Sequence, residues 1–477
     1  MHYHLIGICG TAMASLAGML QVRGHRVTGS DQNVYPPMST QLEALGIEVI
    51  NGYRAETADI GADVVVVGNA ISRGNPELEE ILNRKMLYRS QAEVVKEEFI
   101  RGRRSLVIAG THGKTTTTSI AAWTFEVGGL NPGFLIGGIA QNFNSSFRVS
   151  DSDYFVIEGD EYDTAYFDKK PKFMHYLPEV AIIGNIEFDH ADIYRDLREV
   201  KFQFSRLMNL VPGNGKLICG IDSPAVREVL SEMKGKLFTQ IETFGLSEDA
   251  RWQARYLDFS GDKTRFTVFR DSVAWGEFEM DLIGEFNVRN CLAVIIAADF
   301  WRISKEKIQQ AFNSFKSVKR RMEVRGVCRG IAVIDDFAHH PTAVEETLKA
   351  IRLKYPGRRV IAVFEPRSWS SRLAVFQELY GKAFAFADYV IVSGVYNTAK
   401  ASELGKLLDV DELVGDLAMQ GKPAFALSDA ASIIEHLMPE LKYGDVVVIM
   451  SNGGFDGIHD KLLAKLGAAV GNFAADY

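Results

Sequence analysis

One stretch of the sequence, Arg104–Thr118, has the residues needed to bind phosphate. An apolar run is followed by Gly110-Thr-His-Gly-Lys-Thr-Thr116 and then by residues that favour a helix. The two glycines allow backbone N–H groups to point inward, and the helix adds its positive N-terminal end. Lys114 can reach the terminal phosphates of a nucleotide, and the Thr115 hydroxyl can bind magnesium. The glycine spacing is tighter than in the usual phosphate loop, so a chance Gly-Lys-Thr at an ordinary strand–turn–helix junction is the alternative.

Two acidic clusters follow apolar runs that are suited to strands. One is Glu158-Gly-Asp-Glu-Tyr-Asp163, and the other ends the segment Asn185-Ile-Glu-Phe-Asp-His190. The carboxyl ends of parallel strands face a phosphate site, so both clusters are placed to hold magnesium, which prefers oxygen ligands. For Glu158 an exposed acid at a strand end is the alternative. His190 is as well suited to capping or packing as to ligand binding.

Polar residues also follow expected strands in the last third of the chain. They form the segments Asp335–Pro341, Glu365–Ser368 and Ser451–Phe455, and the pair Arg320-Arg321 precedes them. Adjacent histidines at the start of a helix seldom converge on one ion. We therefore expect His339-His340 to contact substrate or to cap a helix.

The first glycine turn, Gly7-Ile-Cys-Gly-Thr-Ala12, resembles a dinucleotide-binding fingerprint but departs from it, because Cys9 and Ala12 replace the second and third glycines. Ser30-Asp31 follows the second expected strand, where an acid often binds a ribose hydroxyl. The pattern favours binding of a nucleotide or nucleotide-sugar phosphate over NAD or FAD. A turn that only packs a helix on a strand is the alternative.

The elements that position these residues alternate between strands and helices, which predicts an α/β protein. A chain of 477 residues is too long for one core. We expect three domains: a Rossmann-like domain over 1–98, a phosphate-loop ATPase domain over 99–318, and a second Rossmann-like domain over 319–477. Period-two alternation over Arg251–Leu282 predicts antiparallel hairpins added to the central domain.

The composition excludes several classes of protein. The net charge is −8 with acids and bases well mixed, so no nucleic-acid partner is expected. The four cysteines are scattered without a Cys-x-x-Cys pair, which argues against a zinc ribbon or a disulfide framework and fits a reducing cytoplasm. No basic segment leads an apolar run at the start, and no apolar run is long enough for a bilayer, so we expect no membrane insertion.

Taken together, these motifs resemble the Mur ligases, the ATP-dependent amide-forming enzymes of peptidoglycan synthesis. The resemblance rests on residues 109–116, Glu158, Asn185–His190, Asn287 with Asn290, Arg320-Arg321 and Asp335–Pro341, in the family's order. Within the family, Asn33–Thr40, Tyr162–Tyr176, Glu365–Ser368 and Met450–Phe455 favour the branch that joins UDP-N-acetylmuramate to the murein tripeptide L-alanyl-γ-D-glutamyl-meso-diaminopimelate in peptidoglycan recycling. Addition of L-alanine is the nearest alternative.

The resemblance implies that the lactyl carboxylate of the UDP-sugar attacks the γ-phosphate of ATP, and that the peptide amine then displaces phosphate. It implies catalytic roles for Lys114, His190, Arg321 and His340, and magnesium ligation by Thr115, Glu158 and His190. The implied ATP contacts are Gly110, Thr111, His112, Gly113, Lys114, Thr115, Thr116, Asn287, Asn290, Arg320, Arg321 and Asp336. Closure of the last domain about a hinge near residue 318 would complete the site.

The resemblance also implies two substrate-binding regions. The UDP-sugar would contact Gly7, Gly10, Thr11, Met13, Ser30, Asp31, Asn69 and Ala70, with Gly138 and Asn142 toward the sugar. The peptide would contact Arg367, Ser368 and Asn452, because a guanidinium suits a peptide carboxylate.

At three places the sequence departs from the residues that are usual in the Mur ligases. Phe286 stands where the family commonly has His, and Phe337-Ala338 replaces the Tyr-Gly of the alanine-adding enzymes. Lys201 is the only lysine shortly after His190, and we interpret it as a surface residue rather than a carbamylated one.

Two other classes of function differ from a ligase in what they require. An NAD-dependent oxidoreductase would leave the phosphate loop without a role, and a nucleotide switch would hydrolyse ATP without a UDP-sugar. The oligomeric state does not follow from the sequence.

Overall fold

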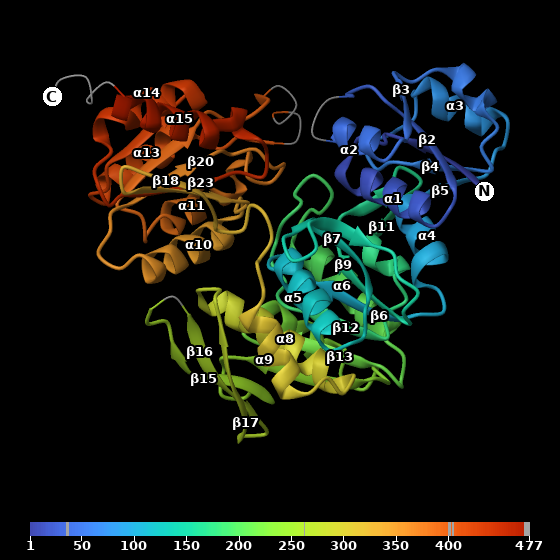
Figure 1. Cartoon of the computed structure of the whole chain (residues 1–477), viewed down its shortest axis with the longest axis horizontal. Coiled ribbons are helices and arrows are strands. Elements are labelled where there is room, and N and C mark those ends of the chain that lie inside the picture. Colours follow the sequence, from blue (N-terminus) through green and yellow to red (C-terminus); the bar gives the residue numbers. More distant parts are fainter. Residues whose placement is uncertain (35–37, 262, 399–401, 403–404, 472–477) are drawn as a thin grey trace.

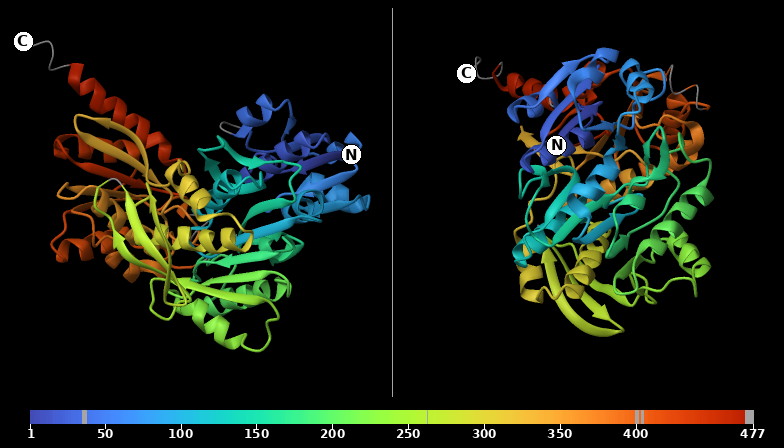
Figure 2. Two further views of the ribbon diagram at one scale, coloured as in Figure 1. Left: turned by 60° about the horizontal axis from the view of Figure 1, so that its bottom comes forward. Right: turned by 90° about the vertical axis from the view of Figure 1, so that its right-hand side faces the viewer.

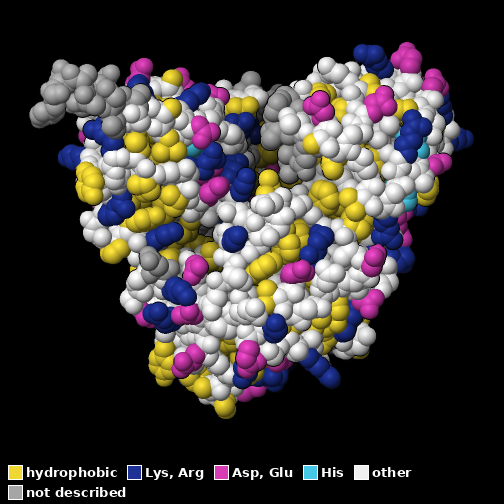
Figure 3. Space-filling model, viewed as in Figure 1, with side chains coloured by type: hydrophobic (Ala, Val, Ile, Leu, Met, Phe, Trp, Pro, Cys, Tyr) yellow, Lys and Arg dark blue, Asp and Glu magenta, His cyan; other side chains and the backbone are white. Residues whose placement is uncertain are grey.

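The computed structural model describes residues 1–34, 38–261, 263–398, 402 and 405–471. Residues 35–37 of the Asn33–Thr40 segment, and position 262 within the expected hairpins of Arg251–Leu282, lie outside the described residues. The chain forms three α/β units, and the first and last both sit on the central one (Figure 1, Figure 2). A hollow separates the first and last units on the face drawn in Figure 3.

The first unit is built on a parallel sheet of five strands in the order β3-β2-β1-β4-β5. Its strands are β1 (His2–Ile6), β2 (Arg26–Asp31), β3 (Glu48–Asn51), β4 (Val64–Val67) and β5 (Tyr88–Ser90). Its helices are α1 (Thr11–Val22), α2 (Met38–Ala44), α3 (Pro76–Asn83) and α4 (Gln91–Val95). The apolar residues of β1 and β4 are buried on both faces, as a parallel sheet covered by helices requires.

The central unit has a ten-stranded sheet in the order β17-β16-β15-β14-β13-β12-β6-β9-β7-β8. Its strands are β6 (Arg104–Ala109), β7 (Gly133–Ala140), β8 (Ser145–Arg148), β9 (Tyr154–Gly159), β12 (Val180–Ile183), β13 (Lys216–Gly220), β14 (Gln240–Gly245), β15 (Trp252–Asp258), β16 (Thr264–Arg270) and β17 (Val273–Met280). Its helices are α5 (Lys114–Val127), α6 (Leu197–Leu210), α7 (Pro224–Glu232), α8 (Glu285–Phe300) and α9 (Lys305–Asn313). The predicted hairpins are confirmed, because β15, β16 and β17 pair antiparallel.

The last unit has a six-stranded sheet in the order β18-β19-β23-β20-β21-β22, and only β18 is antiparallel to its neighbour. The strands are β18 (Glu323–Cys328), β19 (Ile331–Asp336), β20 (Val360–Phe364), β21 (Tyr389–Ser393), β22 (Ala424–Leu427) and β23 (Val446–Met450). The helices are α10 (Pro341–Lys354), α11 (Gln377–Ala383), α13 (Val410–Met419), α14 (Ala430–Glu440) and α15 (Ile458–Gly471). The chain thus has the predicted α/β architecture.

A small hairpin connects the first unit to the central one. Its strands are β10 (Asp163–Ala165) and β11 (Asp168–Pro171), which pair antiparallel outside the large sheets. The side-chain amide of Asn69, in the first unit, donates to the Asp163 carboxylate over 3.0 Å. At the hairpin tip, Phe167 packs edge-on against Tyr88 of β5. The sequence patterns did not predict this hairpin, because its strands are only three and four residues long. Among the described residues, every helix is too short or too polar to cross a membrane.

Candidate active site

The predicted phosphate loop lies between β6, which ends at Ala109, and α5, which begins at Lys114. Gly110 and Gly113 have φ values of +142° and +79°, which residues other than glycine rarely adopt. Asn185 holds the loop in place, since its carbonyl and its side-chain oxygen accept the N–H groups of Thr111 and His112. Asn185, the first residue of the Asn185–His190 segment, thus orders the phosphate loop.

Lys114 makes the central contacts of the loop. Its ammonium group donates to the carbonyl of Gly110 and to a Glu161 carboxylate oxygen, both over 2.7 Å. Burial favours the neutral amine, but the charges of Glu161, Asp160 and Glu158 outweigh it and raise the pKa of Lys114. The lysine is therefore a fixed positive charge at the end of the loop.

Thr115 and Glu158, two predicted magnesium ligands, lie together. The Thr115 hydroxyl donates to Glu158 over 3.1 Å, and the Gly137 N–H donates to the other carboxylate oxygen over 2.8 Å. The Arg321 guanidinium, from the last unit, donates to the Thr115 hydroxyl over 3.2 Å. Burial raises the pKa of Glu158 despite the charge of Lys114. A hydroxyl beside a carboxylate provides the oxygen donors that Mg²⁺ prefers.

A second possible metal group contains His190 and two acids of the predicted Glu158–Asp163 cluster that we did not single out as ligands. One ligand atom from each of Asp160, Glu161 and His190 lies within 4.8 Å of the others. His190 Nε2 is 3.3 Å from Glu161 Oε1, which has no hydrogen bond among the described residues beyond this ion pair. Burial lowers the pKa of His190, but contacts with Glu161, Asp189 and Asp160 raise it to about 9. Two carboxylates and an imidazole suit a divalent cation.

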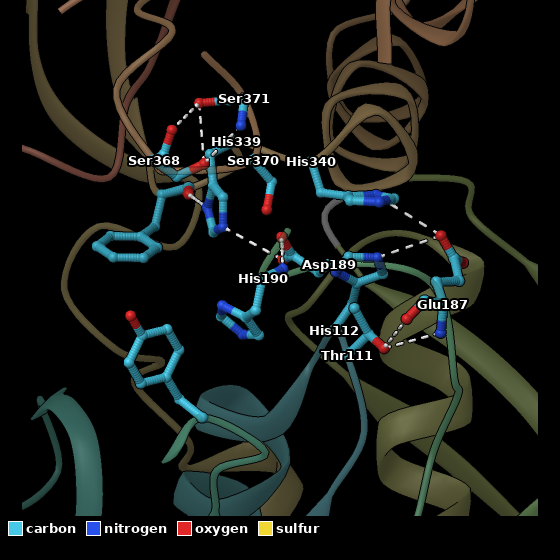
Figure 4. A network of polar contacts seen from close by, with 12 residues as sticks. Thr111, His112, Glu187, Asp189, His190, His339, His340, Ser368, Ser370 and Ser371 are labelled. Carbon is cyan, nitrogen blue, oxygen red and sulfur yellow. Dashed lines mark hydrogen bonds and ion pairs between the residues drawn. The ribbon is translucent and has the colours of Figure 1, made fainter. Parts of the chain in front are cut away.

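The last unit contacts the phosphate loop through His340 (Figure 4). Glu187 lies between two histidines, 3.4 Å from His112 Nε2 and 3.6 Å from His340 Nδ1, and accepts the Thr342 hydroxyl over 2.6 Å. His340 also caps α10, as the helix-capping interpretation predicted. Burial and the nearby His112 lower the pKa of His340 to about 4, so its ring is neutral near pH 7. His340 therefore joins two units at the loop.

A cavity of about 500 Å³ lies between the central and last units, beside the phosphate loop. The predicted ATP residues that line it are His112, Gly113, Lys114, Thr116, Asn287, Asn290, Arg321 and Asp336. Phe286 lines it as well. Gly110, Thr111 and Thr115 lie in the adjoining loop and helix.

Arg320 does not line this cavity. Its guanidinium donates to the carbonyls of Ser451 and Gly453 over 2.6 and 2.7 Å, inside the last unit. Both guanidinium groups lie over the Phe337 ring, but their hydrogen-bond partners differ, since Arg321 donates to Thr115. The sequence could not separate them, and the structure brings only Arg321 to the loop.

A second cavity, of about 1040 Å³, lies at the carboxyl edge of the first sheet. Its lining includes the predicted residues Gly7, Gly10, Thr11, Met13, Asp31, Asn69 and Ala70. The Asp31 carboxylate accepts the N–H groups of Cys9 and Asn33, each over 2.9 Å, and so orders the turn. Ser30 is fully buried beneath it.

Gly138 and Asn142 lie away from this cavity. The Asn142 amide group is bonded at both ends to the segment that leaves α9, to the Ser314 carbonyl and the Lys316 N–H. Gly138 packs closely against Val318 in the same segment. Both residues fasten the connection to the last unit instead of lining the first unit's cavity.

A third cavity, of about 540 Å³, lies between the central and last units, and His190 is one of its lining residues. Arg367, Ser368 and Asn452, the predicted peptide residues, line it with Asp160, Tyr162 and His339. The side-chain oxygen of Asn452 is buried and has no hydrogen-bond partner in the part of the chain that the structure describes. The Arg367 guanidinium lies 3.9 Å from the centre of the Tyr396 ring, another lining residue.

Arg372 is a lining residue that we did not predict. It is 4% exposed, lies 4.0 Å over the Trp369 ring, and donates to the backbone carbonyls of Ser368, Tyr396 and Asn397. Burial lowers the pKa of Arg372, and the charge of Asp192 opposes this shift only in part. An anion bound here would therefore stabilise the buried guanidinium. Lys201, in contrast, pairs with Glu228 and lines none of the three cavities.

The comparisons with known proteins identify the family. Models of the Mur ligase family, catalytic domain, of the Mur ligase middle domain and of the Mur ligase, glutamate ligase domain match residues 2–101, 108–298 and 320–453. These matches cover most of the chain in the order of its three sheets. The chain belongs to the Mur ligase family.

Particular relatives narrow this assignment. The chain is 40% identical over 468 residues to the UDP-N-acetylmuramate–L-alanyl-γ-D-glutamyl-meso-2,6-diaminoheptandioate ligase of Escherichia coli, covering 98% of each. It is 33% identical to a UDP-N-acetylmuramate–L-alanine ligase of a Geobacter species, again covering 98% of each. The crystal structure of a murein peptide ligase from Psychrobacter arcticus matches with a TM-score of 0.72 and 36% identity, covering 98% of this chain and 99% of that one.

Gly113 provides a test of the loop geometry. A Cβ atom there would lie 2.8 Å from Asn290 Oδ1, and the φ of +79° adds backbone strain. We expect Gly113→Ala to weaken the binding of magnesium ATP at least tenfold by calorimetry. Gly129→Ala is the matched control, because Gly129 has a φ of +82° but nothing within 4 Å of its Cβ position. Equal ATP affinity in the two variants would contradict this account of the loop.

Proposed function

We propose that the protein is an ATP-dependent ligase that joins the lactyl carboxylate of UDP-N-acetylmuramate to the amino group of L-alanyl-γ-D-glutamyl-meso-diaminopimelate. The observation that carries this proposal is that three cavities adjoin one charged cluster. The cluster contains Lys114, Glu161, Asp160 and Lys172. Lys114 lines the cavity beside the phosphate loop, Lys172 lines the cavity of the first unit, and Asp160 lines the third cavity. One cavity would hold the UDP-sugar, one ATP and one the peptide, and the corresponding domains are 1–98, 99–318 and 319–477 in that order.

The first step brings two anions together. A lactyl carboxylate oxygen attacks the γ-phosphorus of ATP, the bond from that phosphorus to the bridging oxygen breaks, and ADP leaves with the electron pair. Lys114 and Arg321 face this point and offset the charge. Thr115 and Glu158, with the group of Asp160, Glu161 and His190, would hold Mg²⁺, which supplies further positive charge when bound. Catalysis then depends mainly on positioning and charge neutralisation.

The second step uses the third cavity. The neutral alanyl amine of the peptide attacks the acyl carbon, and the bond from that carbon to the phosphate oxygen breaks. Inorganic phosphate leaves with the electron pair, and the nitrogen releases a proton to solvent to give the amide. The proposed acceptor carries three carboxylates, one on the γ-linked glutamate and two on diaminopimelate. Arg367 and Arg372 lie in this cavity, and a guanidinium fork suits a carboxylate. Free L-alanine carries one carboxylate and would leave much of a 540 Å³ cavity unused.

The remaining substrate contacts follow from the lining residues. Asn287, Asn290 and Phe286 would contact the adenine side of ATP. The turn after β1, with Asp31 and Asn69, would hold the uridine diphosphate. ATP and a UDP-sugar are cytoplasmic metabolites, so we place the enzyme in the cytoplasm, in the recycling of murein peptides.

The acceptor decides between the two ligase activities. We expect protein supplied with ATP, Mg²⁺ and UDP-N-acetylmuramate to release phosphate when the tripeptide is added, and to do so more efficiently than with L-alanine. The measurement is kcat/KM for each acceptor in a coupled phosphate assay. A higher kcat/KM with L-alanine would replace this proposal with the alanine-adding activity. Phosphate release without a UDP-sugar would indicate an uncoupled ATPase.

Arg372 provides a test of acceptor binding. We expect Arg372→Met to raise the KM for the tripeptide at least tenfold, because a charge-assisted hydrogen bond to a carboxylate is lost. The KM values for ATP and UDP-N-acetylmuramate should change less than threefold. Arg358→Met is the control, since Arg358 also binds backbone carbonyls in the last unit but lines none of the cavities. An unchanged tripeptide KM in Arg372→Met would exclude this role.

A further inference from the structure

Lys172 occupies a position that no other described residue shares. It lines both the cavity of the first unit and the cavity that contains Arg367. These are the two cavities in which we place the donor and the acceptor. A group that borders both lies where the two substrates must meet.

The backbone around Lys172 is firmly held. Lys172 follows β11 and begins a short 3₁₀ helix, Lys172–His175. Its N–H donates to the Tyr162 carbonyl over 3.3 Å. The next residue, Phe173, is fully buried and packs against Phe204 of α6. The hairpin that precedes Lys172 is also fastened to the first unit, through Asn69 and Phe167. The position of the side chain is therefore tied to both units.

The side chain of Lys172 extends the charged cluster toward the first cavity. Its ammonium group donates to Asp160 Oδ2 over 2.5 Å, and Asp160 belongs to the group with Glu161 and His190. Glu161 in turn binds Lys114. The two lysines thus lie at opposite ends of one set of acids, Lys114 beside the ATP cavity and Lys172 beside the other two.

We propose that Lys172 binds the lactyl carboxylate of the UDP-sugar and holds it for attack on the γ-phosphate. This inference rests on the proposed function, because it takes the first cavity as the donor site. The carboxylate must leave that cavity to reach the ATP beside Lys114, and Lys172 is the cation at the border. It balances the carboxylate charge while the phosphate bond forms and ADP departs, and it then faces the acyl oxygen.

A purely structural lysine would serve only as the counterion of Asp160. The two roles differ in what they predict for ligand binding. A carboxylate-binding lysine discriminates UDP-N-acetylmuramate from UDP-N-acetylglucosamine, which has the same nucleotide and sugar but lacks the lactyl group. A counterion of Asp160 does not, because both ligands present the same groups to the rest of the cavity.

The test is calorimetric titration of both UDP-sugars, without ATP or metal. We expect the wild-type chain to bind UDP-N-acetylmuramate about tenfold or more tightly than UDP-N-acetylglucosamine, the size of one charge-assisted hydrogen bond. In Lys172→Met this preference should fall below threefold, with the affinity for UDP-N-acetylglucosamine unchanged. Lys172→Gln is a second neutral variant that serves if the methionine variant does not fold. Lys172→Arg should keep part of the preference.

Lys169 supplies the matched control. It lies in the same hairpin and pairs with Asp163 over 2.6 Å, but it is 67% exposed and lines none of the cavities. Lys169→Met should keep the full preference. A preference in Lys172→Met equal to that of the wild type would overturn the assignment of Lys172. A wild-type chain that binds neither UDP-sugar would instead overturn the proposed function.

Discussion

The ion pair between Lys114 and Glu161 lies at the centre of this structure. Both groups are largely buried, and charges interact more strongly there than in water. Glu161 adjoins Asp160 and His190, and Asp160 adjoins Lys172. Acids and bases therefore alternate from the phosphate loop to the edge of the first unit. Such an arrangement can exchange its internal partners for substrate phosphates and carboxylates, which suits a reaction that joins two anions.

Each of the three sheets contributes its carboxyl edge to this cluster. The central sheet provides the loop after β6 and the acids after β9. The first sheet contributes the cavity around Asp31, and the last provides Arg321, His340 and the residues of the third cavity. Polar contacts between units include Asn69 with Asp163, Arg321 with Thr115, and Thr342 with Glu187. One hydrophobic core also runs from the first unit into the central one.

The sequence predicted those parts of the fold and site that depend on neighbours along the chain. Strand–helix alternation gave three α/β units, and the phosphate loop was recognisable because its glycines, lysine and threonine are consecutive. Residues that act through tertiary contacts were missed or misplaced. Arg320 and Arg321 could not be separated, because their roles depend on tertiary partners: Arg320 binds carbonyls within the last unit and Arg321 reaches Thr115. Asn142 fastens the 314–316 segment, and Lys172 gains its position from a hairpin too short to predict.

The central claim is that the cluster activates a carboxylate by transferring a phosphoryl group to it. Isotope transfer tests this most directly. UDP-N-acetylmuramate labelled with ¹⁸O in both oxygens of the lactyl carboxylate would be turned over with ATP and the tripeptide, and the released phosphate analysed by mass spectrometry. The account predicts one ¹⁸O atom in each phosphate, because the attacking oxygen stays on phosphorus when the amine displaces it. Phosphate without label would contradict it.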